Sequence, residues 1–360
     1  MIRLLFWLSM VLILGSCGNG NPLNTDYKPK AISKSNDLVV VADKQIWEGE
    51  VGDTFRYYFE SAYPITPSPE PIFKLRFFTP QELDAEPLRK QLRTYCVLAN
   101  LADTTSWTTR LIRKDYGEAK FGELLRDDAP QTGVGMNKWA MDQLIIYIYS
   151  KSEEELIEAV REHFHPIASK IHEHDATQIK ANTYISGRHL GLTEKLSKEF
   201  GIKMDIPGDY REALSKKGKE DQHQLLWLRK DTPKATLNLV FQKMKYKDIE
   251  QISVGNAIAL TNEFGANVQT DNPESKLRVN QTDLPILENV KEINGNYTLE
   301  IRGIWEMTQD FMGGPFVSYL IPQEGEGNYI FIHCFVYAPG IEKKQFLQEL
   351  EVVVNSFDFL

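Results

Sequence analysis

The sequence predicts an α+β protein of two domains, each an antiparallel or mixed sheet flanked by helices. Apolar, β-branched runs such as residues 38–42 and 144–149 are typical of buried strands. Residues 153–171 instead carry apolar side chains at helical spacing, so the chain mixes strands with amphipathic helices. A length of 360 residues suits two domains of ordinary size. We expect an N-terminal domain over residues 37–199 and a C-terminal domain over residues 200–360.

The first half predicts strands that are separated by helical segments. These strands are expected at residues 38–42, 72–78, 93–101, 108–113 and 144–149. Asp43 could cap a short helix that carries Trp47, and residues 64–71 hold four prolines, which favours a rigid extended connector over a docking epitope. Ser152 and Glu155 have the spacing of a helix capping box. Pro166 should kink or end the helix that follows, because proline lacks a backbone N–H.

The second half begins with helical sequence near residues 190–200 and then becomes rich in strands. We expect strands at residues 202–206, 225–229, 236–244, 297–306, 316–321 and 329–337, and helices at residues 248–263 and near Phe346 to Val354. Residues 75–80 and 228–233 share Leu-Arg and Thr-Pro at the same internal spacing. This repeat leaves two alternatives open, an internal duplication or two unlike domains.

The N-terminus has the layout of a secretory signal peptide over residues 1–16. Arg3 precedes an apolar run that is shorter than the roughly 20 residues of a membrane span. Residues 14–17 read Leu-Gly-Ser-Cys, which resembles the lipobox of bacterial lipoproteins, where cleavage precedes the cysteine and its thiol receives a diacylglycerol. The resemblance implies lipid attachment at Cys17, rather than a plain signal peptide or an uncleaved anchor. Residues 17–36 have the polar composition of a flexible linker.

Charge and cysteine content restrict the partners that the protein can have. A formal net charge of −9 argues against nucleic acid as the main partner. If Cys17 carries lipid, the membrane is a partner through that covalent lipid, and we expect the body in the bacterial cell envelope at a periplasm-facing leaflet. Cys96 and Cys334 are the other thiols. They could pair in an oxidising compartment, but two buried free cysteines are the simpler expectation.

The sharpest candidate site is a group of four histidines, for which divalent metal would have affinity. These are His163, His165, His172 and His174. No two of them have the i, i+3 or i, i+4 spacing that brings side chains together on a helix, so we expect a polar helix face and no metal. The sequence contains no catalytic or cofactor-binding motif of the kinds that mark nucleophile elbows or phosphate loops. We therefore expect no catalytic residues and no cofactor.

Two family resemblances bear on the fold. Residues 200–207 and 335–359 resemble a PsbP/Mog1-type domain, which implies an antiparallel sheet with helices on both faces and an accessory, assembly or binding role. Residues 39–43 with Trp47, residues 69–73 and residues 204–207 resemble a lipoprotein family of Bacteroidetes known as a domain of unknown function. That second resemblance implies no catalytic residues.

Three functions stay open from the sequence. The first is a lipid-anchored, non-catalytic binding or accessory module that acts through contacts with an envelope protein. The second is a solute-binding lipoprotein that uses a cleft between the two halves. The third is a metal-dependent hydrolase that uses the histidine group. A pocket with converging polar groups between the halves would favour the second.

Overall fold

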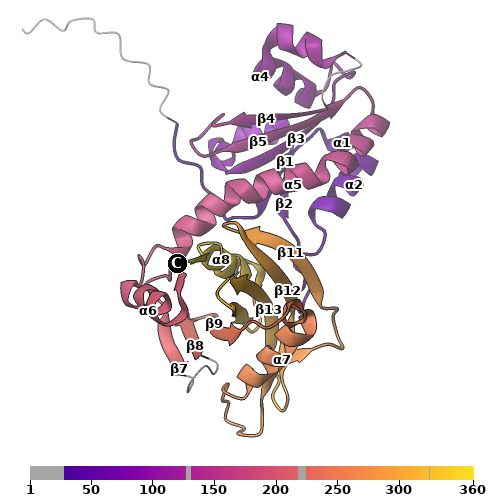
Figure 1. Cartoon of the computed structure of the whole chain (residues 1–360). Helices are drawn as coiled ribbons and strands as arrows, with labels where there is room; N and C mark the ends of the chain where they lie inside the picture. Colours follow the sequence, from indigo (N-terminus) through magenta and orange to yellow (C-terminus); the bar gives the residue numbers. More distant parts are fainter. Residues whose placement is uncertain (1–27, 127–130, 218–223, 324) are drawn as a thin grey trace, which may run out of the picture.

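The computed structural model describes residues 28–126, 131–217, 224–323 and 325–360, which form two domains in contact (Figure 1). The long helix α5 extends from the N-terminal domain toward the C-terminal one (Figure 1). Both domains combine a sheet with packed helices, which confirms the α+β prediction.

The N-terminal sheet is mixed and mostly parallel. Its order is β2-β1-β3-β5-β4, and only β4 runs antiparallel to its neighbour. The strands are β1 Asp37–Val41, β2 Lys74–Phe78, β3 Thr94–Asn100, β4 Thr132–Met136 and β5 Leu144–Ser150. The central strands β1, β3 and β5 are buried, which explains their continuous apolar runs.

Helices cover both faces of this sheet, as expected for parallel strands joined by helical crossovers. Helices α1, α2 and α5 share a core with one face, and α3 and α4 share a core with the other. Their bounds are α1 Lys44–Glu48, α2 Glu50–Phe59, α3 Pro80–Ala85, the 3₁₀ turn η1 Pro87–Gln91, α4 Trp107–Leu124 and α5 Glu153–Thr183. The predicted strand at 108–113 is wrong. Those residues lie in α4, which begins after Ser106 accepts a hydrogen bond from the Thr109 backbone N–H.

Of the two outcomes predicted for Pro166, an end of the helix is wrong, because α5 continues through that residue. Pro166 lies on the exposed side of the helix, where water can bind the carbonyl group that proline leaves without an N–H partner. On the opposite side, Phe164, Ile167 and Ala168 are buried in the sheet core. Burial of this apolar face keeps the helix continuous.

The C-terminal domain is built on an antiparallel sheet with the order β10-β12-β13-β14-β9-β8-β7, to which β11 adds by pairing with β12. The strands are β7 Arg211–Lys216, β8 Gln224–Asp231, β9 Thr236–Lys245, β10 Leu277–Asn280, β11 Leu287–Ile293, β12 Asn296–Met307, β13 Gly313–Gln323 and β14 Asn328–Tyr337. The short strands β6 Ile202–Lys203 and β15 Asp358–Phe359 pair separately. The predicted pair at 225–229 and 236–244 corresponds to β8 and β9.

Helices cover both faces of this second sheet. Helices α6 and α8 pack on one face, and α7 packs on the other. Their bounds are α6 Leu190–Phe200, the 3₁₀ turn η2 Ile249–Gln251, α7 Val254–Gly265 and α8 Lys344–Val354. An antiparallel sheet with helices on both faces is the architecture that the sequence led us to expect for this half.

Several features of the domain organisation differ in detail from expectation. The two sheets have different topologies, one mostly parallel and one antiparallel, so the halves are unlike at the level of fold. Helix α6, which we placed before the boundary, packs with the core of the C-terminal domain. Residues 28–36, expected to be linker, already contact the N-terminal domain, where Ala31 and Asn36 are buried.

Cys96 and Cys334 are buried and free, and each belongs to the core of a different domain. Burial raises the pKa of the Cys96 thiol far above its usual value. Both side chains therefore serve as small apolar core residues. Over the residues with described positions, the chain contains no helix with the length and apolarity to cross a membrane.

Candidate binding crevice between the domains

A crevice of about 720 Å³ lies where the two domains meet. The N-terminal domain contributes residues 33–37, Lys74 and the end of α5 near residues 178–183. The C-terminal domain contributes Lys234, from the turn between β8 and β9, and residues 340–349 at the start of α8. The volume is within the range of pockets that hold small molecules, and domain interfaces are a common place for them.

A carboxylate from the N-terminal domain fixes one wall of this crevice. Glu70 is buried and accepts hydrogen bonds from the backbone N–H groups of Lys343 at 2.7 Å and Lys344 at 2.8 Å. These groups lie at the start of α8, where backbone donors have no partner within the helix. Glu70 therefore caps a helix of the other domain, so the proline-rich connector is part of the domain interface.

The Lys344 side chain crosses the same interface. Its ammonium donates to the carbonyl oxygens of Pro71 at 2.6 Å and Ile72 at 2.8 Å. Burial lowers the pKa of Lys344 to about 8, while Glu342 and Glu70 oppose this shift. The position of α8 thus depends on backbone groups of the connector.

A pair of amides closes the deep end of the crevice. Asn36 donates to Gln348 at 2.8 Å, and Gln348 donates back to Asn36 at 3.1 Å. The Asn36 backbone is in the left-handed region with φ of 68°, which asparagine tolerates better than most residues. The N–H of Asn36 donates to Asp175 at 2.6 Å, so the turn, α5 and α8 are tied together.

Burial raises the pKa of the Asp175 carboxyl, against the opposing effects of the Asn36 N–H and of Arg93. Arg93 lies 3.6 Å from Asp175 and donates to the backbone carbonyl of His174 at 2.7 Å. This buried pair fixes the end of α5 against the sheet. The charges of Arg93 and Asp175 balance each other inside the protein, so neither is a free charged group of the crevice.

Beyond the crevice, a hydrogen bond from Tyr63 joins the domains at an ion-pair network of the C-terminal domain. The Tyr63 hydroxyl donates to Glu351 at 3.3 Å, and Arg302 forms an ion pair with the same carboxylate at 2.7 Å. Arg302 also pairs with the buried Glu300 at 2.7 Å, and Lys291 pairs with Glu300 at 2.5 Å. Four charged groups therefore balance one another at the junction. Together with the Glu70 cap, the hydrogen bond of Tyr63 to this network holds the two walls of the crevice together.

The four candidate histidines all lie on α5, but the structure does not bring them together. His172 stacks on Phe73 with ring centroids 5.1 Å apart, and His165 lies against Phe164. Burial, followed by the charge of Arg93, lowers the pKa of His174 to about 4. In the described parts of the chain, no group of three or more histidine, cysteine, aspartate or glutamate side chains is placed to hold a metal ion. Cys17, the predicted lipid attachment residue, lies outside the described residues.

The carboxyl edge of the parallel sheet, where α/β folds commonly bind ligands, is occupied by the chain itself. Asp43 follows β1 and accepts hydrogen bonds from the hydroxyls of Ser106 and Thr108 and from the backbone N–H groups of Trp107 and Thr108. Asp43 is the N-cap residue of α1, as predicted, but its side chain makes no capping hydrogen bond there and instead satisfies the N-terminus of α4. An internal carboxylate thus fills the position that a ligand anion would take.

Sequence reasoning missed the residues of the crevice for a physical reason. Asn36, Glu70, Lys234 and Lys344 come from four distant segments, and only the docking of the two domains brings them close. The one local signal was Glu70, a charged residue between two prolines of the connector.

Comparisons with known proteins identify two domains of unknown function. Residues 31–184 match a family model described as a domain of unknown function (DUF8532), and residues 190–356 match another described as a domain of unknown function (DUF4837). The gap between them falls between α5 and α6. The search of curated proteins found no match.

Among solved structures, the human StarD13 (DLC2) lipid transfer and protein localization domain is similar over 48% of this chain and 96% of that chain. The identity is 15% and the TM-score is 0.18, so no argument rests on this similarity.

Proposed function

We propose that the protein is a lipid-anchored, non-catalytic binding protein of the bacterial cell envelope, and that its ligand site is the crevice between the two domains. The observation that carries the proposal is the convergence of polar side chains from both domains on a cavity of about 720 Å³. The interface bonds of Glu70, Lys344 and Asn36 support it, because they preorganise the walls before a ligand arrives.

A binding role is favoured over catalysis by the chemistry of the lining. Among the residues that the structure describes, those that line the crevice include no histidine and no cysteine. The hydroxyls of Ser33 and Ser35 donate to the carbonyl of Lys34 and to Gln178, and neither faces a base that could activate it. The polar lining suits a small hydrophilic solute.

The anchoring part of the proposal is supported by the sequence. The lipobox-like residues 14–17 place Cys17 eleven positions before Lys28, whose side chain donates to the Asn137 carbonyl at 2.8 Å. A periplasm-facing membrane leaflet is the location that this arrangement favours. Action through an envelope protein partner, in line with the PsbP/Mog1 resemblance, is the second candidate.

The test is to close the crevice with a bulky side chain. Gln345 lines the cavity, is exposed, and its side chain makes no hydrogen bond within the described residues, so Gln345→Trp fills space without breaking a contact. Gln81→Trp, at an exposed position of α3, is the matched control. Small polar solutes are then screened by thermal shift and calorimetry on the purified full chain.

We expect a solute that raises the Tm of the wild-type protein and of Gln81→Trp but not that of Gln345→Trp. A solute that binds all three proteins with equal Kd would place the binding site elsewhere and refute the proposal for the crevice.

A further inference from the structure

The carboxylates that line the crevice already have cationic partners. Asp37 pairs with Arg76 at 2.9 Å, Glu342 with Lys74 at 2.6 Å, and Glu349 with Lys230 at 2.5 Å. Lys230 also reaches Asp209 at 2.9 Å, which leaves one carboxylate in excess at that corner. Burial raises the pKa of the Glu349 carboxyl, against the opposing effect of Lys230.

Two lysines of the lining have no such partner. The side chains of Lys34 and Lys234 make no hydrogen bond or ion pair to any other described residue, and both are exposed. Lys34 comes from the N-terminal domain and Lys234 from the C-terminal domain. The uncompensated positive charges of the crevice are therefore contributed by both walls.

The Lys234 position is fixed by the turn that carries it. The Thr232 hydroxyl accepts from the backbone N–H groups of Lys234 at 3.3 Å and Ala235 at 2.9 Å, which is a threonine-stabilised turn. A further bond joins the N–H of Thr232 to the carbonyl of Ala235 at 2.8 Å. This tight turn presents the Lys234 side chain from a rigid base.

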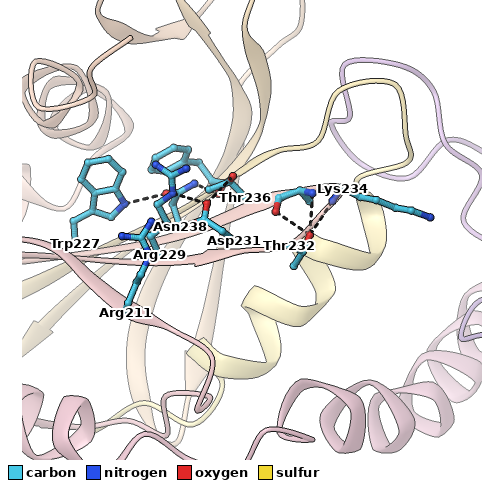
Figure 2. Close-up of polar contacts among 10 residues, drawn as sticks. Arg211, Trp227, Arg229, Asp231, Thr232, Lys234, Thr236 and Asn238 are labelled. Atoms are coloured by element: carbon cyan, nitrogen blue, oxygen red, sulfur yellow. Dashed lines mark hydrogen bonds and ion pairs between the residues drawn. The ribbon is translucent and has the colours of Figure 1, made fainter. Parts of the chain in front are cut away.

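The nearest acidic residue of this strand pair is engaged elsewhere. Asp231 accepts from Arg211 at 2.6 Å, from Arg229 at 2.7 Å and from Thr236 at 3.2 Å. Figure 2 shows these side chains gathered around Asp231, with Lys234 pointing away from them. Asp231 is thus unable to neutralise Lys234.

Lys344 adds a third positive charge to the lining. Its two acceptors are neutral carbonyl groups, so its charge is solvated but not cancelled by them. Glu70 offsets part of this charge through the adjacent helix cap. Lys344 and Glu70 therefore add no excess negative charge to oppose Lys34 and Lys234.

We infer that the crevice binds an anionic solute, a carboxylate or a phosphate, held between Lys34 of one domain and Lys234 of the other. This inference rests on the proposed function and specifies its ligand class. Ammonium groups that lack a counter-ion form strong, charge-assisted hydrogen bonds with such anions. Binding would join the two domains through the ligand.

The test is calorimetric titration of the full chain with inorganic phosphate, with citrate and with glucose as a neutral probe. The variant is Lys34→Gln with Lys234→Gln. The matched control is Lys247→Gln with Lys276→Gln, which changes the net charge equally at two exposed lysines outside the crevice. Urea unfolding of both double variants checks that their stability is retained.

We expect one or both anions to bind, with a Kd that rises by about tenfold or more in the crevice variant and by much less in the control. The phosphate and citrate titrations distinguish the two anion classes. The affinity should also fall with added salt, because the lysines are exposed.

Equal affinity in all three proteins, or no binding of either anion, would overturn the inference. Binding of a neutral solute that Gln345→Trp abolishes, without binding of anions, would overturn the anion assignment and leave the crevice proposal standing. If no solute of either kind binds, both proposals fail.

Discussion

At the scale of single residues, His333 is the most unusual group of the C-terminal core. It lies on β14, is fully buried, and is surrounded by Phe264, Phe316 and two further aromatic rings. Its Nδ1 lies 2.8 Å from the Ser318 hydroxyl, and its Nε2 has no hydrogen-bond partner among the described residues. Burial lowers the pKa of His333 to about 3, so the ring is neutral in the folded protein.

This environment predicts that acid destabilises the fold. Below the usual histidine pKa of about 6.5, the unfolded chain takes up a proton that folded His333 refuses. The free energy of unfolding should therefore fall by about 1.4 kcal/mol per pH unit for this residue as pH drops from 6 toward 4. His174, with its pKa lowered to about 4, contributes in the same direction.

The measurement is urea unfolding of the wild type and of His333→Phe at pH 7, 6 and 5. The free energy of unfolding of the variant should depend less steeply on pH than that of the wild type. The difference corresponds to one proton taken up on unfolding, because phenylalanine does not titrate. His165→Phe, which replaces an exposed histidine of α5, is the control for the exchange of histidine for phenylalanine. An equal pH dependence in His333→Phe and the wild type would contradict the assignment.

At the scale of elements, the start of α8 depends on a carboxylate from the other domain. Glu70→Ala leaves the N–H groups of Lys343 and Lys344 without their partner in a buried place. We expect a loss of about 2 kcal/mol in the free energy of unfolding. Glu70→Gln should lose less, because an amide oxygen still accepts a hydrogen bond.

Hydrogen exchange provides the second measurement for this cap. The amides of Lys343 and Lys344 should exchange faster in Glu70→Ala. Glu342→Ala is the control, because Glu342 pairs with Lys74 at the same interface but is half exposed, and exposed pairs contribute about 0.5 kcal/mol. If Glu342→Ala lowers the free energy of unfolding as much as Glu70→Ala does, the helix cap has no special role in stability.

The elements that the sequence predicted well are those whose pattern is set by one sheet face or one helix face. Strands β1, β5, β9 and β14 and helix α6 fall in this class, since their apolar spacing directly reports burial. Strands β7 and β11 were missed because both are largely exposed and polar. Because only a few side chains of these two strands are buried, their sequences show no clear two-residue alternation of apolar and polar residues.

The errors at Thr108 and Pro166 have a tertiary origin. Residues 108–113 contain β-branched side chains that favour strands, but Asp43, from a distant part of the chain, satisfies the N-terminus of α4. Pro166 is tolerated because α5 packs on a sheet along the opposite face. Neither partner could be inferred from the local sequence. The same holds for the crevice, which exists only after the domains dock.

At the scale of the whole molecule, the two domains form one unit with a polar cavity at their interface. Strong contacts at Glu70, Lys344 and Asn36 lie beside the cavity, and the hydrogen bond from Tyr63 to Glu351 joins the domains beyond it. Such an arrangement favours a ligand that fits the preformed cavity. A ligand that had to bring two separate domains together would lose binding free energy in ordering them.

The proposed lipid tether would determine where this unit works, and it provides the last prediction. Cys17 and Lys28 are eleven positions apart, a separation of at most about 40 Å even when the chain is fully extended. A lipid on Cys17 would hold the body within that distance of the membrane. Cys17→Ala should then abolish incorporation of radiolabelled palmitate and move the protein out of the membrane fraction.

Cys96→Ala is the matched thiol control, because Cys96 is buried in the N-terminal core and has a raised pKa, so it cannot act as an accessible nucleophile. It should retain both the label and the membrane fraction. Palmitate labelling that persists in Cys17→Ala would show that Cys17 is not the lipid attachment residue and would contradict this part of the proposal. The crevice would be unaffected by that result, since its walls are formed by residues 33–349 and do not depend on the anchor.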